Sequence, residues 1–171
     1  MTILITDRLT LTPMQAADLP DLTALWADPD FATAIFPAPL SSEDVWFRLL
    51  RDIGHWAALG HGAWSMRRKT DGAYVGSVGV VDYQRDLDPP FDAPEFAWGV
   101  GGAFQGKGFA REGVDAALAW VDGVFAAPCT VCMISPDNAP SLKLAARVGF
   151  KSYAEGAYKD GPVQLLQRRR P

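Results

Sequence analysis

The segment Gln105-Gly106-Lys107-Gly108-Phe109-Ala110 decides the fold of this 171-residue sequence. An alternating strand pattern precedes it at residues 95–100, and a helical pattern follows it to residue 121. Glycines let the backbone approach a ligand closely, and the first N–H groups of a helix have no acceptor within the helix. Together with the helix dipole, these N–H groups favour a bound pyrophosphate. The segment therefore predicts a phosphate-binding turn between a strand and a helix, and the alternative is a tight turn that binds nothing.

The rest of the chain predicts a mixed α/β domain around this turn. Strand patterns cover residues 8–12, 63–67, 73–83, 95–100, 130–134, 150–154 and 163–167. Helices are expected to begin at an Asp18 cap, at Ser41 or Ser42, within the glycine-rich turn and at an Asn138 cap. We expect one domain over residues 1–171, with about seven strands in a largely antiparallel sheet flanked by about four helices. The strand-helix-strand unit at residues 95–134 predicts a parallel crossover.

The composition and charge argue against several classes of function. The formal net charge of −4 disfavours a broad nucleic-acid-binding face. The sequence has no stretch typical of a membrane span and no signal-peptide pattern, so we expect a cytoplasmic protein with no membrane partner. Cys129 and Cys132 form a CxxC on a predicted strand, where residues three apart point to opposite faces. His55 and His61 lie far back in the chain, so we expect no metal site.

Two nucleotide-binding motifs can be tested against the glycine-rich turn, and both fail. A P-loop would use Gly101, Gly106 and Lys107, but it requires Ser or Thr at the next position, which is Gly108. The dinucleotide fingerprint requires a third glycine where Arg111 stands. An acyl-CoA site is an alternative to these two motifs.

Four segments in order resemble the GNAT acetyltransferases. The turn Gln105 to Ala110 resembles the family signature Gln/Arg-x-x-Gly-x-Gly/Ala. Three further segments resemble the branch that acetylates the N-termini of ribosomal proteins. Residues 6–11 resemble its opening strand, residues 95–100 its central strand, and residues 138–150 its late helix with the Gly-Phe ending. The resemblance covers nearly the whole chain, and it implies a GNAT-like fold with a splayed central pair of strands.

The resemblance implies a binding mode for acetyl-CoA, with no metal. In this family the central strand carries a bulge and splays from the next strand, and pantetheine lies in the gap. The backbone near Val100 would then hold the pantetheine arm and polarise the thioester carbonyl. The N–H groups of the turn Gln105 to Ala110 would hold the pyrophosphate. Asn138 would contact pantetheine from the other side, and its alternative role is helix capping.

The resemblance also implies catalytic candidates. Amine attack on a thioester needs a neutral amine and a stabilised leaving thiolate. Glu95 stands where this branch tends to place a catalytic glutamate acting through water, and the alternative is an exposed carboxylate at a strand start. Ser141 is a candidate hydrogen-bond donor to the departing sulfur, and the alternative is a second capping hydroxyl. Many GNAT enzymes have a tyrosine as thiolate proton donor at the position of Ala145, so this chain departs from the pattern.

These residues predict an acetyl-CoA-dependent N-acetyltransferase that transfers acetyl directly to an amine in a ternary complex. The acceptor is expected to be a protein N-terminus or a small amine such as a polyamine or aminoglycoside. A non-catalytic acyl-CoA-binding module is the alternative. The loops at 28–40 and 86–94 would define the acceptor, and the acidic residues around the second loop suggest a cationic one. The sequence carries no signal for a particular oligomeric state.

Overall fold

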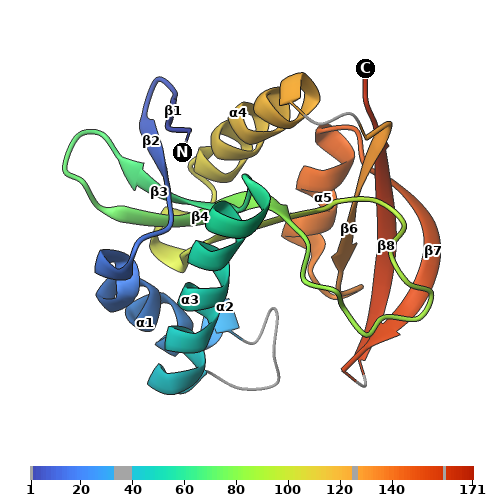
Figure 1. The fold of residues 1–171 in the computed structure, drawn as a ribbon, viewed down its shortest axis with the longest axis horizontal. Coiled ribbons are helices and arrows are strands. Elements are labelled where there is room, and N and C mark those ends of the chain that lie inside the picture. Colours follow the sequence, from blue (N-terminus) through green and yellow to red (C-terminus); the bar gives the residue numbers. More distant parts are fainter. Residues whose placement is uncertain (1, 33–39, 125–126, 160) are drawn as a thin grey trace.

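The computed structural model describes residues 2–32, 40–124, 127–159 and 161–171. Eight strands form one sheet in the order β1-β2-β3-β4-β5-β6-β8-β7 (Figure 1). The strands are β1 (Leu4–Ile5), β2 (Leu9–Pro13), β3 (Ala63–Arg68), β4 (Tyr74–Val81), β5 (Glu95–Val100), β6 (Cys129–Ile134), β7 (Lys151–Tyr158) and β8 (Gly161–Arg169). The helices are α1 (Leu19–Ala27), α2 (Pro29–Ala32), α3 (Ser42–Leu59), α4 (Phe109–Val124) and α5 (Ala139–Arg147), with short 3-10 turns at Ala16–Asp18 and Gly102–Phe104.

The expected mixed α/β fold with a largely antiparallel sheet is confirmed. Every described pair of neighbouring strands is antiparallel except β5 and β6, which are parallel. The structure adds the two-residue strand β1 and the single-turn helix α2 to the expected elements. The last two strands, β7 and β8, are longer than expected. Most residues of β7 are exposed or half-buried, so its sequence shows only a weak alternation of apolar and polar residues.

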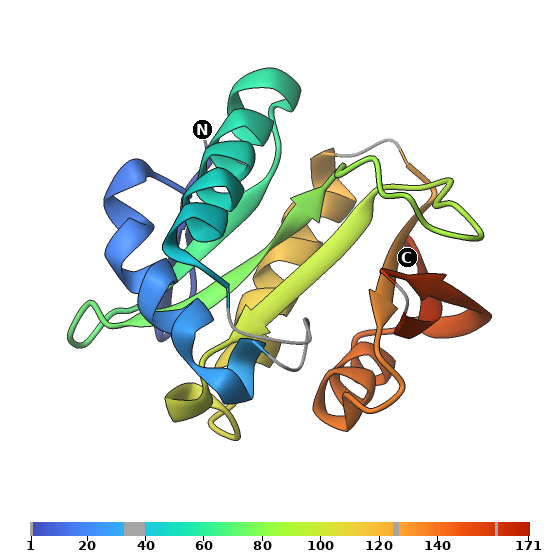
Figure 2. The same ribbon diagram turned by 90° about the horizontal axis from the view of Figure 1, so that it is seen from below.

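The core is divided between the two sides of the sheet. Figure 2 shows α4 on one side of β3, β4 and β5, and α1 and α3 on the other. The larger cluster includes Leu11, Trp64, Met66, Val80, Val114, Ala117, Leu118 and Val121, so the apolar stripe of α4 packs on the strands. The smaller cluster under α1 and α3 includes Met14, Leu22, Val45, Leu49, Ala63 and Val81. Helix α3 begins with a capping box in which the Asp44 N–H donates to Ser41 Oγ at 3.1 Å.

The side-chain cap predicted for Asp18 at the start of α1 does not form. Asp18 occupies the N-cap position of α1, but its side chain does not cap the helix. Its carboxylate accepts hydrogen bonds from Ser65 at 2.8 Å and from Arg67 at 2.7 Å instead. Ser65 and Arg67 lie in β3, so this carboxylate joins the start of α1 to the sheet.

The sheet opens between β5 and β6, as expected for a splayed central pair. The strands share one register pair, Glu95 with Val131, and the Val131 N–H donates to the Pro94 carbonyl at 3.0 Å. The bulge expected in the central strand is absent. β5 keeps a continuous register with β4 from Val81–Glu95 to Gly76–Val100. The opening therefore arises from the divergence of β6, while β5 stays fixed to β4.

Candidate functional site

A cleft of about 860 Å³ lies where β5 and β6 have separated. It is bounded by the end of β5, the glycine-rich turn, the start of α4 and the first turns of α5. Seven of the predicted residues line it: Val100, Gln105, Gly106, Gly108, Ala110, Asn138 and Ser141. The structure thus brings together the turn and the late helix, which are about thirty residues apart in the sequence.

The turn has the backbone conformation that its glycines predict. Gly106 and Gly108 have φ of 72° and 81°, a left-handed region that other residues rarely adopt. After Gly108, the first N–H that bonds within α4 is that of Glu112, which donates to the Gly108 carbonyl at 3.1 Å. Helix geometry therefore leaves the N–H groups of residues 109–111 without intrahelical acceptors. These N–H groups at the positive end of the helix dipole are suited to an anionic ligand.

Lys107 and Phe109 are not among the residues that line the cleft. The Lys107 ammonium donates to the Ala103 carbonyl at 2.7 Å, so it folds back on the preceding 3-10 turn. Phe109 is buried and packs edge-to-face on Phe104, with 6.0 Å between the ring centroids. These two predicted cofactor-binding residues therefore direct their side chains away from the cleft.

Arg8 holds the turn in place, a role that the sequence did not predict. Its Nε donates to Glu112 at 2.6 Å, its Nη1 donates to the Lys107 carbonyl at 2.9 Å, and its guanidinium lies 4.6 Å from the centroid of Phe109. Thr6 donates to the same Glu112 carboxylate at 2.6 Å. Partial burial raises the pKa of Glu112, but the hydrogen bonds from Thr6 and Arg8 outweigh it, so the pKa is lowered. The resemblance included residues 6–11 but gave Arg8 no role, because its partners lie about a hundred residues away.

The first turn of α5 forms the opposite wall of the cleft. The Ser141 N–H donates to Asn138 Oδ1 at 3.1 Å, so the capping role expected of Asn138 is confirmed. Ala145 is fully buried in the core, so the family's tyrosine position offers no acidic group. Three cationic side chains that sequence reasoning did not identify also line the cleft: Arg111, Lys143 and Arg147.

Glu95 lies at the other end of β5 and does not line this cleft. Its position five residues before Val100 places it about 17 Å away along the strand. The side chain is only 6% exposed, so the alternative of an exposed carboxylate at the strand start is wrong. Arg85 donates to both of its oxygens, from Nε at 2.6 Å and from Nη2 at 2.8 Å, and donates from Nη1 to the Tyr158 hydroxyl at 3.0 Å. Burial lowers the pKa of Arg85, but the hydrogen bonds and charge of Glu95 outweigh this effect and raise the pKa.

A second cleft of about 460 Å³ lies at this end of β5. Its walls come from α3, the loop between β4 and β5, and the β7–β8 hairpin. Of the acidic residues around that loop, Asp86 faces this cleft, Asp82 accepts a hydrogen bond from Gln84, and Glu95 is paired with Arg85. Residues 33–39 of the other predicted acceptor loop lie outside the described residues.

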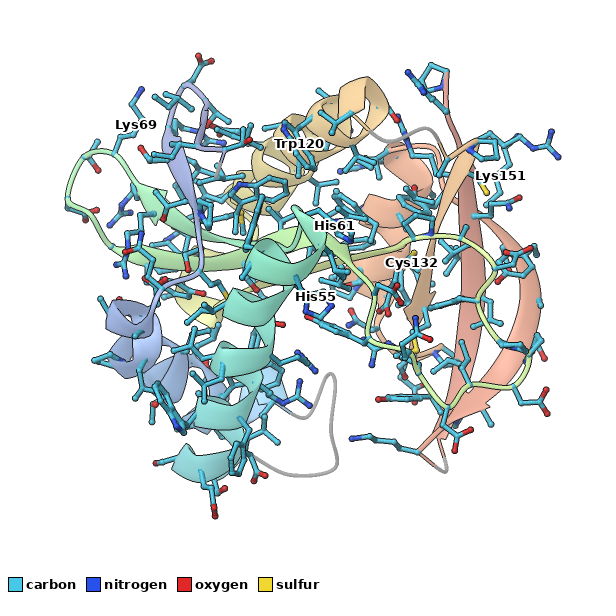
Figure 3. All side chains as sticks on the ribbon, viewed as in Figure 1. His55, His61, Lys69, Trp120, Cys132 and Lys151 are labelled. Carbon is cyan, nitrogen blue, oxygen red and sulfur yellow. The ribbon has the colours of Figure 1, made fainter. Side chains whose placement is uncertain are left out.

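The described residues contain no cluster of His, Cys, Asp and Glu arranged to hold a metal ion. Cys132 is buried on β6 while His55 belongs to α3 (Figure 3). The ring nitrogens of His55 lie 2.9 Å from the Arg51 carbonyl and 3.0 Å from the Asp82 carbonyl, so His55 fastens α3 to the end of β4. Within the described ranges, no helix combines the length and apolarity needed to cross a bilayer.

Comparisons with known proteins identify the family of this chain. Residues 8–151 match the Acetyltransferase (GNAT) domain, so the chain belongs to the GNAT acetyltransferases. A structure described as a GNAT-family acetyltransferase from Bordetella pertussis is 34% identical with a TM-score of 0.87, covering 98% of this chain and 99% of that one. An acetyltransferase from Agrobacterium tumefaciens is 26% identical with a TM-score of 0.85, covering 99% and 95%.

A further solved structure shares the fold at lower identity. It is RimL, the ribosomal L7/L12 alpha-N-protein acetyltransferase, in a complex with coenzyme A. It is 15% identical with a TM-score of 0.80, and the match covers 98% of each chain. At this identity the likeness shows a common fold.

Proposed function

We propose that the protein transfers an acetyl group from acetyl-CoA to a primary amine by direct attack in a ternary complex. The observation that carries this proposal is the open edge of β5. One edge of β5 pairs with β4 over all six residues, while the other edge meets β6 only at Glu95. Trp98, Gly99 and Val100 line the cleft at this unpaired edge, and an extended chain with amide groups can add to such an edge. The pantetheine arm of coenzyme A has this chemistry.

The two ends of the cleft suit the remaining parts of coenzyme A. The glycine-rich turn offers N–H groups from residues 105–110 to the pyrophosphate, and Gly106 and Gly108 keep side chains away from it. Arg111, Lys143 and Arg147 line the same cleft and provide positive charge for phosphate groups. Asn138 and Ser141 would contact pantetheine from α5, on the side opposite Val100.

In the proposed reaction, the neutral amine attacks the thioester carbon, the carbon–sulfur bond breaks, and the amine loses a proton. Backbone N–H groups on the unpaired edge of β5, between Glu95 and Val100, stabilise the negative charge that develops on the carbonyl oxygen. Glu95 lies where β5 and β6 meet, at the closed end of the opening along which pantetheine would extend. Arg85 donates two hydrogen bonds to the Glu95 carboxylate, and a carboxylate with two such hydrogen bonds still has lone pairs to accept the amine proton through water. Ser141 donates a hydrogen bond to the departing thiolate.

Thiol release from acetyl-CoA tests the proposal directly. The purified protein is incubated with acetyl-CoA and a panel of peptides, amino acids, polyamines and aminoglycosides, and acetylated products are identified by mass spectrometry. We expect amine-dependent thiol release and an amide product. Coenzyme A binding by calorimetry, without thiol release for any amine, would favour the non-catalytic module. The fold shared with RimL supports including N-terminal peptides in the panel.

A further inference from the structure

The second cleft is lined by three cations from three separate segments of the chain. Arg51 comes from α3, Arg85 from the loop between β4 and β5, and Lys159 from the turn after β7. Figure 1 shows that loop crossing to the β7–β8 hairpin, where Asp88 and Ala157 form an isolated β-bridge. The volume of about 460 Å³ is in the range of small-molecule sites.

Aromatic rings hold these cations in fixed positions. The Arg51 guanidinium lies 3.6 Å from the centroid of Tyr83, and that of Arg85 lies 4.9 Å from the same ring. Arg85 also lies 5.0 Å from the centroid of Tyr158, and the Lys159 ammonium lies 5.6 Å from it. Cations and rings therefore alternate along the cleft, an arrangement that reduces the entropy lost when the side chains bind a ligand.

The carboxylates that balance these arginines lie behind the cleft. Asp52 pairs with Arg51 at 3.1 Å and Glu95 with Arg85 at 2.6 Å, and both acids are buried and absent from the lining. Arg85 has five N–H groups, and three of them bond to acceptors among the described residues. The pKa of Arg48 on the same helix is lowered, mainly by burial and then by repulsion from Arg51. The exposed carboxylate in the lining is that of Asp86.

The backbone gives an independent sign of a functional site. Among the described residues, the non-glycine residues with a left-handed backbone are Gln84, with φ of 47°, and Lys159, with φ of 50°. Both line this cleft. Such conformations are uncommon outside glycine, and they concentrate at ligand-binding sites.

We propose that this cleft binds a carboxylate of the acceptor molecule, through Arg51, Arg85 and Lys159. This inference rests on the proposed amine acetylation and names its substrate class: an amine that carries an acidic group, in place of the cationic acceptor suggested by the acidic residues of the sequence. Arg85 lines the cleft and also pairs with Glu95, so the cleft lies beside Glu95. An acceptor whose carboxylate binds in the cleft therefore has its amine near the point where β5 and β6 meet. The same positive charges lower the pKa of a nearby amine and favour its neutral, nucleophilic form.

Matched acceptor pairs test this proposal. Each pair consists of an acid and its amide: free amino acids against amino-acid amides, and peptides with Asp against peptides with Asn at the second position. We expect kcat/KM to be higher for the acid by about tenfold or more, with the difference in the acceptor KM. Preference within the first pair indicates a small amino acid, and preference within the second indicates an acidic peptide. Equal rates within every pair, or better rates with polyamines, overturn the carboxylate site while leaving acetyl transfer intact.

Variants locate the effect. Arg51→Gln and Lys159→Gln should bring the acid-to-amide ratio toward one without changing the KM for acetyl-CoA. Lys151→Gln is the control, because it removes one positive charge at the opposite end of β7 (Figure 3). A ratio that is unchanged in both cleft variants, or reduced equally in Lys151→Gln, contradicts the assignment.

A binding measurement separates this proposal from the catalytic one. Glutarate has two carboxylates and no amine, so calorimetry with glutarate requires no acetyl transfer. We expect the wild-type protein and Lys151→Gln to bind it and Arg51→Gln to bind it about tenfold more weakly or worse. If glutarate binds in this order but no amine is acetylated, the anion site is supported and the proposed reaction is contradicted. Absence of glutarate binding to the wild-type protein counts against the anion site, whatever the activity.

Discussion

The two ends of β5 are built in different ways. At the Val100 end, one continuous turn and the start of one helix supply backbone N–H groups, and glycines keep the surface open. At the Glu95 end, side chains from three segments meet around a buried ion pair. A ligand held by backbone groups needs only a local sequence pattern, whereas a ligand held by side chains needs long-range packing. The comparison explains why one end of β5 could be recognised in the sequence and the other could not.

The largest expected effect concerns the Glu95 end. If Glu95 is the base, Glu95→Gln should lower kcat by about 10² or more, because general-base catalysis is typically worth about 10² to 10⁴. The affinity for acetyl-CoA should stay near wild type, since Glu95 does not line the cofactor cleft. Steady-state kinetics and calorimetry measure the two quantities.

Loss of the ion pair complicates that variant, because Glu95→Gln leaves the Arg85 charge buried without its carboxylate. The double variant Glu95→Gln/Arg85→Gln removes both charges and serves as the control. Recovery of kcat in the double variant, at saturating acceptor, would mean that Glu95 acts only through the ion pair. A double variant that folds and stays slow supports the base.

The next effect concerns the Val100 end and should be confined to the cofactor. Gly108→Asp places a carboxylate beside the pyrophosphate site, and it forces a side chain onto a backbone with φ of 81°, where Cβ would lie 3.3 Å from Arg8 Nη2. We expect acetyl-CoA affinity to fall by more than about tenfold, or about 1.4 kcal/mol. Gly123→Asp near the end of α4, where Cβ meets no atom within 4 Å, is a matched control. Unchanged affinity in folded Gly108→Asp would remove the turn from the cofactor site.

A smaller effect is expected from Arg8, which supports the turn from outside the cleft. Arg8→Gln removes its ion pair with Glu112 and its hydrogen bond to the Lys107 carbonyl. The Arg8 side chain is 48% exposed, and an exposed pair is worth up to about 1 kcal/mol, so we expect acetyl-CoA affinity to fall by about fivefold or less. Titration of acetyl-CoA at low and physiological salt measures it. A loss as large as that of Gly108→Asp would show that Arg8 contacts the cofactor itself.

Sequence and resemblance predicted the parts of the fold that depend on neighbouring residues. The order of elements, the turn at Gly106 and Gly108, and the Asn138 cap are confirmed, because each depends on residues within a few positions. The Asp18 cap was wrong because Ser65 and Arg67, which are 47 and 49 residues away, bind its carboxylate. A propensity for capping cannot include a partner that only the sheet brings close.

The candidate site follows the same division. Seven cofactor-binding or catalytic candidates line one cleft. The pairing of Glu95 with Arg85 was not predicted, because a long loop separates the two residues although they are only ten positions apart. The bulge expected from the resemblance is absent, since β5 pairs with β4 without interruption. The acidic residues around that loop suggested a cationic acceptor, which stays a prediction; in the folded chain Glu95 is buried, and the second cleft is lined by Asp86 and three cations. Counting charges along a loop does not reveal which of them will face a ligand.

The smallest effect is expected at Ser141, which belongs to the Val100 end but is proposed to act on the reaction. Its backbone N–H, rather than its hydroxyl, donates to Asn138, so Ser141→Ala should leave the cap and the thermal stability unchanged. The buried methyl of Ala145 offers no proton in place of the family's tyrosine, so either the Ser141 hydroxyl or water assists the departing thiolate, or no donor is needed. A thiolate is a good leaving group, since thiols such as that of cysteine have a pKa of only about 8.5, so assistance by one neutral hydrogen bond should be worth about tenfold or less in kcat. A loss of about 10² with unchanged acetyl-CoA affinity would make Ser141 the required proton donor, and a kcat equal to wild type would mean that water serves or that no donor is needed. Either result sharpens the contrast between the ends of β5, because it shows whether the cofactor end contributes a side chain to the chemistry or only a backbone to binding.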